Sequence, residues 1–140
     1  MNKIKITENE KIKFSYQTKI RIGDLNYGNH LAHDKLISIV HDARISFFLE
    51  NNLSEVNYED TFLFMIKSLS IDYINQSFLH ENLKINIYVG EINKVSFELK
   101  YEILKDNSLV ALCVTTLVCY NTLKRRLDQL PASFISVLLK

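Results

Sequence analysis

A single change of hydrophobic period divides this sequence and limits what it can fold into. Over residues 33–50, apolar side chains recur at helical spacing, and Leu36, Val40 and Phe47 fall on one stripe. From Phe62 onward the period is two, which is typical of strands with one buried face. One long helix followed by strands and short turns predicts an α+β fold, in which an antiparallel sheet packs against the helix.

Five strands are expected in this sheet. In the first, residues 14–22, the side chains of Tyr16, Thr18, Ile20 and Ile22 share one face and alternate with polar neighbours. The remaining strands are expected at residues 68–74, 83–89, 94–103 and 108–120. The last of them is apolar on both faces, which favours a central position in the sheet or a place at an interface.

Length and composition favour one ordinary globular domain. The chain has 140 residues, of which 47% are hydrophobic, with three glycines and one proline, so we expect residues 1–140 to form a single domain. A net charge of +1 gives no basic field for a nucleic-acid partner. No apolar run approaches a membrane span or a signal peptide, so a cytoplasmic location without membrane contact is expected. Cys113 and Cys119 are expected to be unpaired core residues.

One loop and the helix that follows it concentrate the residues that could perform chemistry. Within "RIGDLNYGNHLAHDKLISIVHDAR", the ionisable and amide side chains of interest are Asp24, Asn26, His30, His33, Asp34, His41 and Asp42. His30, His33 and Asp34 could be taken for metal ligands, but no further ligand cluster accompanies them, and we expect no metal. No phosphate-binding glycine loop and no nucleophile elbow are present.

This stretch resembles the opening motif of the hotdog-fold acyl-CoA thioesterases, the 4-hydroxybenzoyl-CoA thioesterase-like family. The family pattern runs roughly R-x-x-D-x-D-x-x-G-H-x-N-N and ends in E-x-A-R. Here Arg21, Asp24, His30, Ala43 and Arg44 keep the family's residue types. The segments "SLSIDYINQSF" and "LVCYNTLKRRLDQLP" resemble later strands of the family, so the likeness covers nearly the whole chain.

The resemblance implies a hotdog fold, with one long helix wrapped by a five-stranded antiparallel sheet. It implies an acyl-CoA thioesterase that releases a carboxylic acid and free coenzyme A. Coenzyme A would be part of the substrate, and no other cofactor is expected. It also implies a homodimer or homotetramer, with the active site between subunits.

One departure from the family pattern falls on its catalytic loop. The aspartate that usually serves as base or nucleophile is replaced by Asn26, and an amide can neither accept a proton at neutral pH nor form an acyl anhydride. Asn26 could orient water or the thioester, or it could be an ordinary turn residue. His33 falls where the family's main-chain oxyanion donor lies, although the position is equally typical of a helix start.

With the aspartate gone, either another group serves as base, or the chemistry has changed or been lost, and the helix after the loop offers candidate bases. Asp34 and His41 are seven residues apart and therefore share one helix face. An imidazole can accept a proton near neutral pH, so His41 is the expected base and Asp34 the competing candidate. A purely structural role for His41 has about equal weight.

Two groups of residues are candidates for substrate contacts. Phe64, with Phe47 and Phe62, could line an acyl pocket, as could any apolar core. The basic run Lys124, Arg125 and Arg126 could bind the phosphates of coenzyme A, or could be a solvated charge cluster.

Two other functions remain open. "GDLNYGNH" is similar to the G-D-x-N-P-x-H signature of hotdog enoyl-CoA hydratases, although here the histidine comes one residue late and the proline is missing. Loss of the loop aspartate would also fit a module that binds acyl-CoA or an acyl carrier without turnover.

Overall fold

The computed structural model describes residues 4–57 and 61–140. Its elements, in chain order, are β1 (Phe14–Lys19), the short 3₁₀ helix η1 (Ile22–Asp24), α1 (His33–Glu50), β2 (Val56–Asn57), β3 (Phe62–Tyr73), β4 (Asn82–Ile92), β5 (Ser96–Lys105), β6 (Ser108–Asn121), β7 (Arg126–Leu127) and α2 (Ala132–Leu138). In the described part of the chain, no helix has the length and apolar character needed to cross a membrane.

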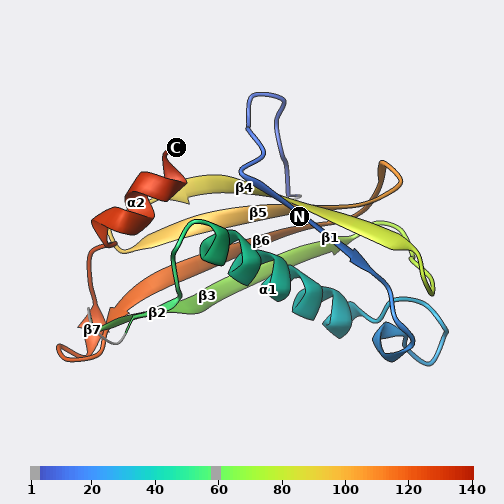
Figure 1. Cartoon of the computed structure of the whole chain (residues 1–140), viewed down its shortest axis with the longest axis horizontal. Helices are drawn as coiled ribbons and strands as arrows, with labels where there is room; N and C mark the ends of the chain where they lie inside the picture. Colours follow the sequence, from blue (N-terminus) through green and yellow to red (C-terminus); the bar gives the residue numbers. More distant parts are fainter. Residues whose placement is uncertain (1–3, 58–60) are drawn as a thin grey trace.

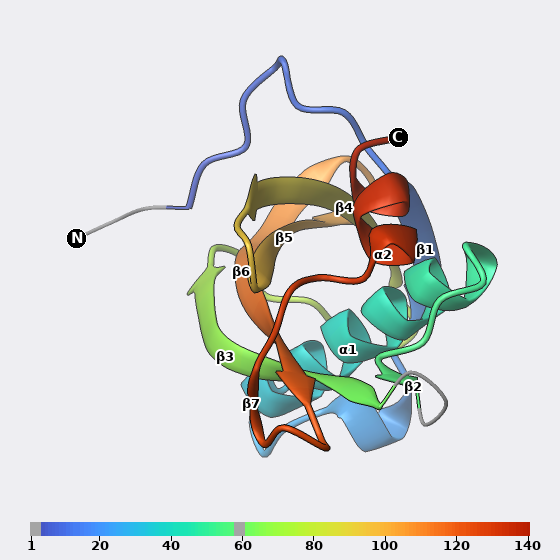
Figure 2. The same ribbon diagram turned by 90° about the vertical axis from the view of Figure 1, so that its left-hand side faces the viewer.

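The strands form one antiparallel sheet that curves around α1. Their order is β1-β4-β5-β6-β3-β2, with β7 paired to β6. Figure 1 shows α1 running along the sheet, and Figure 2, seen from the end, shows the sheet bent around the helix. This is the α+β architecture that the periodicity predicts and the hotdog fold that the resemblance implies, with seven strands in the sheet instead of five. The five predicted strands are the five longer ones, while β2, β7 and α2 had no counterpart in the prediction.

Helix α1 is the spine of the core. It begins and ends at the predicted residues, and Leu36, Val40, Ala43 and Phe47 are all buried against the sheet. Because these four residues lie on one stripe, their burial fixes how the helix is rotated. The polar loop that precedes α1 is therefore held at one end of the sheet.

The first strand is shorter than predicted. It ends at Lys19, and although Ile20 is fully buried, Ile22 is 74% exposed and begins η1. The Arg21 N–H donates to the Asp24 carboxylate over 2.9 Å, and the Asp24 N–H donates back to the Arg21 carbonyl. These two bonds turn the chain before Ile22 could continue the strand, so the prediction for Ile22 was wrong.

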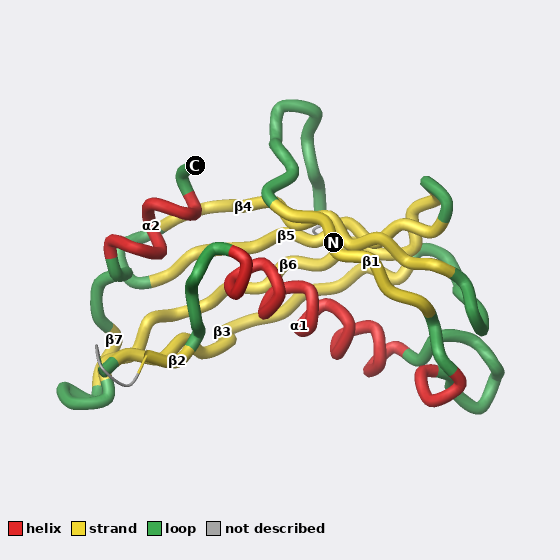
Figure 3. The backbone as a smooth tube through the Cα atoms, in the orientation of Figure 1, coloured by secondary structure: helices red, strands yellow, loops and turns green. Residues whose placement is uncertain are grey.

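The opposite end of the core is aromatic. The ring of Phe134, in α2, packs against those of Phe48, Phe62, Phe64 and Phe97, with its closest ring centroid, that of Phe64, at 4.4 Å. Helix α2 thus closes the core at the end where β6 and β7 meet. Figure 3 shows this end and the loop before α1 at opposite ends of the long axis.

Candidate active site

The loop before α1 is closed by its own backbone. The Asn26 N–H donates to the His30 carbonyl over 2.9 Å, and the Asn29 N–H donates to the Asn26 carbonyl over 3.0 Å. Asn29 has a φ of 64°, in the left-handed region that asparagine tolerates better than most residues. The Ala32 N–H then donates to the Asp24 carbonyl over 2.9 Å, which fixes where α1 begins.

The side chain of Asn26 is turned into this loop. Its Oδ1 accepts hydrogen bonds from the Gly28 N–H (2.9 Å) and the His30 N–H (3.3 Å). Its amide nitrogen lies 3.3 Å from Nδ1 and 3.4 Å from Nε2 of His30, beside the imidazole ring. The turn role considered for Asn26 is therefore present in the structure, and its role toward water or substrate stays a prediction.

The connection between β3 and β4 packs beside the loop. The Leu31 N–H donates to the Ser77 carbonyl over 2.7 Å, and the amides of Ile74 and Asn75 both donate to the Val110 carbonyl. The Tyr73 hydroxyl donates to the His33 carbonyl over 3.2 Å. Loop, helix start and sheet are thus joined at one place.

A cavity of about 290 Å³ opens where these segments meet. It is lined by Asn26, His30, Leu31, His33, Leu36, Tyr73, Ile74, Asn75, Gln76, Ser77 and Val110. Two of the predicted site residues, Asn26 and His33, therefore share one cavity. His30, which lies between them in the sequence, also lines the cavity, although no catalytic role was predicted for it.

The amino end of α1 faces this cavity without a side-chain cap. The first intrahelical bond runs from the Leu36 N–H to the Ala32 carbonyl, so the amides of residues 33–35 precede the hydrogen-bonded part of the helix. Such amides, together with the helix dipole, attract negative charge. Because His33 lines the cavity, its main-chain N–H is suited to bind a developing oxyanion.

Tyr73 borders the cavity as a neutral hydroxyl. Burial raises the pKa of Tyr73, and negative charge at Cys113 and Asp34 would raise it further. Its ring packs edge-on against the His33 ring, with centroids 6.4 Å apart. Tyr73 therefore holds both the carbonyl and the side chain of His33 in place.

The other predicted site residues lie elsewhere in the same chain. Asp34 and His41 are exposed on α1 and do not line the cavity. Phe64 is 6% exposed within the aromatic cluster, nine residues along β3 from Tyr73, or about 30 Å at ~3.3 Å per residue. Residues 124–126 are exposed at that same distant end. Their roles as base and as substrate contacts stay predictions.

A buried ion pair joins α1 to the segment just before β2. The Arg44 guanidinium lies 2.5 Å from the Glu55 carboxylate, and both side chains are largely buried. Burial raises the pKa of the nearby Tyr101 to about 12, even though Arg44 and the hydroxyl of Thr115 act in the opposite direction. Tyr101 therefore stays neutral and is linked to Thr115 over 2.8 Å.

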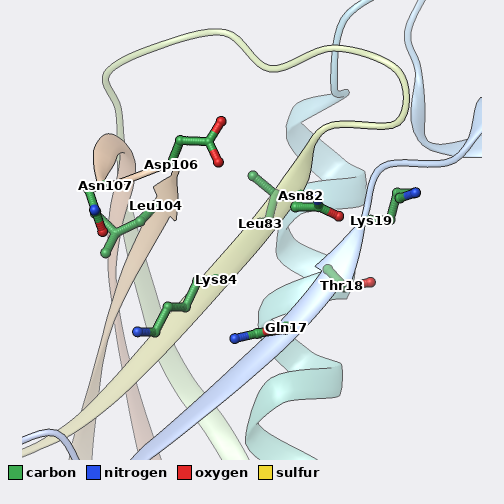
Figure 4. Close-up of a pocket in the computed structure, with 9 residues that line it drawn as sticks. All are labelled: Gln17, Thr18, Lys19, Asn82, Leu83, Lys84, Leu104, Asp106 and Asn107. Atoms are coloured by element: carbon green, nitrogen blue, oxygen red, sulfur yellow. The ribbon is translucent and has the colours of Figure 1, made fainter.

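A second hollow, of about 680 Å³, lies over the paired ends of β1 and β4 and the turn between β5 and β6. Figure 4 shows its lining, which includes Lys19, Lys84, Asn82 and Asp106. None of the predicted catalytic residues lines it. Among the described residues, no group of three or more His, Cys, Asp or Glu side chains is arranged to hold a metal ion.

Comparison with known proteins connects this geometry to an activity. A family model described as "Thioesterase-like superfamily" matches residues 20–138. The chain is 25% identical over 131 residues to a 1,4-dihydroxy-2-naphthoyl-CoA hydrolase from Nostoc punctiforme, covering 89% of this chain and 85% of the relative.

Solved structures share the fold. A 1,4-dihydroxy-2-naphthoyl-CoA thioesterase from Synechocystis superimposes with a TM-score of 0.85 at 21% identity, covering 91% of this chain and 96% of the other. A Staphylococcus aureus protein solved in complex with CoA superimposes with a TM-score of 0.84 at 17% identity, covering 96% and 86%.

Proposed function

The chain belongs to the thioesterase-like superfamily, and from this premise we propose that it hydrolyses an acyl-CoA thioester to a carboxylic acid and free coenzyme A. The observation that carries the proposal is the uncapped amino end of α1, which opens into a cavity at the loop that bears the family motif. The reaction needs an oxyanion site and an activated water, and no cofactor beyond the substrate's own coenzyme A.

The main-chain N–H of His33 is the oxyanion donor in this proposal. When water attacks the thioester carbon, negative charge develops on the carbonyl oxygen, and a fixed amide at a helix start stabilises that charge more than it stabilises the neutral carbonyl. The Tyr73–His33 hydrogen bond keeps the first turn in place during the reaction. Asn26 fixes the loop and presents its amide group beside the cavity.

The acyl group is aromatic in our proposal. The named relatives act on 1,4-dihydroxy-2-naphthoyl-CoA, a thioester with a fused ring pair. A cavity of ~150 Å³ can hold benzene, so about 290 Å³ leaves room for one or two rings. The lining includes three amide side chains and two imidazoles, which suits a ring that carries polar substituents.

A second copy of the chain would complete the site. β2 pairs only with Leu63 and Phe62 of β3, so among the described residues no strand covers the outer edge of β3 from Met65 to Tyr73. Exposed apolar side chains, among them Ile66 and Leu69, lie along this strand. Open edges of this kind favour pairing with another strand, and we propose a homodimer, or a tetramer built from it, joined through β3.

Antiparallel pairing of the two β3 strands would place the Phe62 end of one copy beside the Tyr73 end of the other. The turn that carries Lys124, Arg125 and Arg126 would then approach the neighbouring subunit's cavity, where it could bind coenzyme A phosphates. This arrangement gives the basic turn a role that it cannot have within one chain. A cytoplasmic location fits the two free, buried cysteines.

Release of free thiol tests the function. We expect the purified protein to release coenzyme A from benzoyl-, hydroxybenzoyl- or naphthoyl-CoA faster than from butyryl- or palmitoyl-CoA, measured with a thiol-reactive chromophore. A parallel assay follows loss of the enoyl absorbance of crotonyl-CoA in the ultraviolet. Hydration without thiol release would establish the hydratase instead, and tight acyl-CoA binding with neither reaction would establish a binding module.

A further inference from the structure

The cavity holds few groups that could accept a proton from water. Among the described residues that line it, only His30, His33 and Tyr73 have titratable side chains, and none is a carboxylate. The Asp24 carboxylate is used by the Arg21 N–H at the other side of the loop. Because the pKa of Tyr73 is raised and its hydroxyl donates a hydrogen bond to the His33 carbonyl, the choice among the groups of this chain lies between the two histidines.

The side chains of His30 and His33 have different surroundings. The His33 side chain is exposed and packs edge-on against the Tyr73 ring, and the main-chain N–H of His33 is already the oxyanion donor of the proposed function. The His30 ring is partly buried within the loop, beside Asn26, the position where the family places its carboxylate. A base at His30 would therefore approach the reacting water from nearly the same side as the missing aspartate.

Backbone contacts hold the His30 ring in place. Its Nδ1 lies 3.4 Å from the Leu31 carbonyl oxygen, which can accept a hydrogen bond from an Nδ1–H, the tautomer that leaves the lone pair on Nε2. The ring also lies against Gly28, where a Cβ would come within 3.4 Å of Cδ2 and Nε2. The glycine leaves room for the imidazole, and the Asn26 amide nitrogen lies 3.3 Å from Nδ1 and 3.4 Å from Nε2 of the ring.

We propose that His30 is the general base of this thioesterase, replacing the carboxylate that Asn26 lacks; this rests on the proposed function. Nε2 accepts a proton from water as the water oxygen bonds to the thioester carbon, and the His33 N–H binds the resulting oxyanion. The intermediate then collapses, the C–S bond breaks, and the coenzyme A sulfur takes the proton from the imidazolium. The products are the carboxylic acid and free coenzyme A, and the imidazole returns to its neutral form.

His30→Ala tests the assignment because the main-chain N–H and carbonyl of residue 30, which close the loop onto Asn26, are kept. Loss of a general base should lower kcat by ~10²-fold or more, with a small change in KM. The limb of the kcat/KM profile that rises with pH should disappear. Added imidazole should restore part of kcat, because it can occupy the space that the side chain leaves.

Two further variants keep the test decisive. His30→Gln retains an amide that can donate to the Leu31 carbonyl but has no basic nitrogen, so it should lose kcat as His30→Ala does. His80→Gln makes the same change at an exposed histidine that does not line the cavity, and it should behave as wild type. Wild-type rates in both His30 variants would overturn the assignment.

Imidazole rescue of His33→Ala or His41→Ala, without rescue of His30→Ala, would also overturn it in favour of those residues. Failure of wild-type protein to release any thiol would instead reject the proposed function, so the two failures are distinguishable. Restored turnover in the Asn26→Asp, His30→Ala double variant would support the assignment, because it returns a base to the same side of the cavity.

Discussion

Replacing Phe64 separates a role in the core from a role in substrate binding. Phe64 is 6% exposed, and its ring centroid lies 4.4 Å from that of Phe134 and 5.5 Å from those of Phe62 and Phe97. Truncating a buried phenylalanine to alanine costs about 3–5 kcal/mol, and the loss of three ring pairs favours the upper half of that range. Against a total stability of about 5–15 kcal/mol, that is a large fraction.

Urea unfolding followed by circular dichroism, at one protein concentration, measures this cost. We expect Phe64→Ala to lose about 4 kcal/mol of unfolding free energy, and the better volume match Phe64→Leu to lose less than about 1.5 kcal/mol. Phe78→Ala serves as the control, because Phe78 is about half exposed and its truncation should cost less than about 1 kcal/mol.

The same variants are then tested for turnover. Phe64→Leu should keep the wild-type order of preference among acyl-CoA substrates, because its side chain is buried in the core of its own subunit. A changed acyl preference in Phe64→Leu, with stability unchanged, would refute this reasoning and return Phe64 to the acyl pocket.

Three further outcomes follow from the structure. Leu69→Lys places a charge on the open part of β3 and should shift light-scattering mass toward the monomer, with turnover falling in parallel; a dimer of unchanged mass would contradict pairing through β3. Asn26→Asp keeps the oxygen that binds the Gly28 and His30 amides and should retain or raise kcat, whereas Asn26→Ala loses that contact and should lower kcat by ~10²-fold. Burial raises the pKa of the Cys113 thiol to about 12, so at pH 8 the folded protein should resist iodoacetamide at this residue, and labelling should appear only in urea; rapid labelling without urea would show that the thiol is accessible.

Much of the fold could be predicted because it depends on periodic burial. The stripe on α1 is long and regular, so both of its ends were predicted correctly. Helix α2 was missed because it has only seven residues and follows a proline, and its burial comes from Phe134 meeting rings supplied by distant strands. Ile22 was misplaced because local bonds between Arg21 and Asp24 override the alternation.

The site was only partly predictable for a related reason. Asn26 and His33 lie seven residues apart in the motif, and the structure places both at one cavity. The role proposed here for His30 depends on how the loop folds back between Asn26 and Leu31, which periodicity does not report. The spacing of His30 four residues after Asn26, across a glycine, is the sequence signal that could have indicated contact between the two side chains.

The central claim is that water attacks the thioester directly at this cavity, without a protein carboxylate. To test this claim, a single turnover is run in ¹⁸O-labelled water with enzyme in excess over an aromatic acyl-CoA. Mass spectrometry then gives the ¹⁸O content of the released acid and of the protein. We expect one ¹⁸O atom in the released acid and none in the protein. Unlabelled acid together with ¹⁸O in an Asp or Glu side chain would show that a carboxylate forms an acyl anhydride, and would contradict the account.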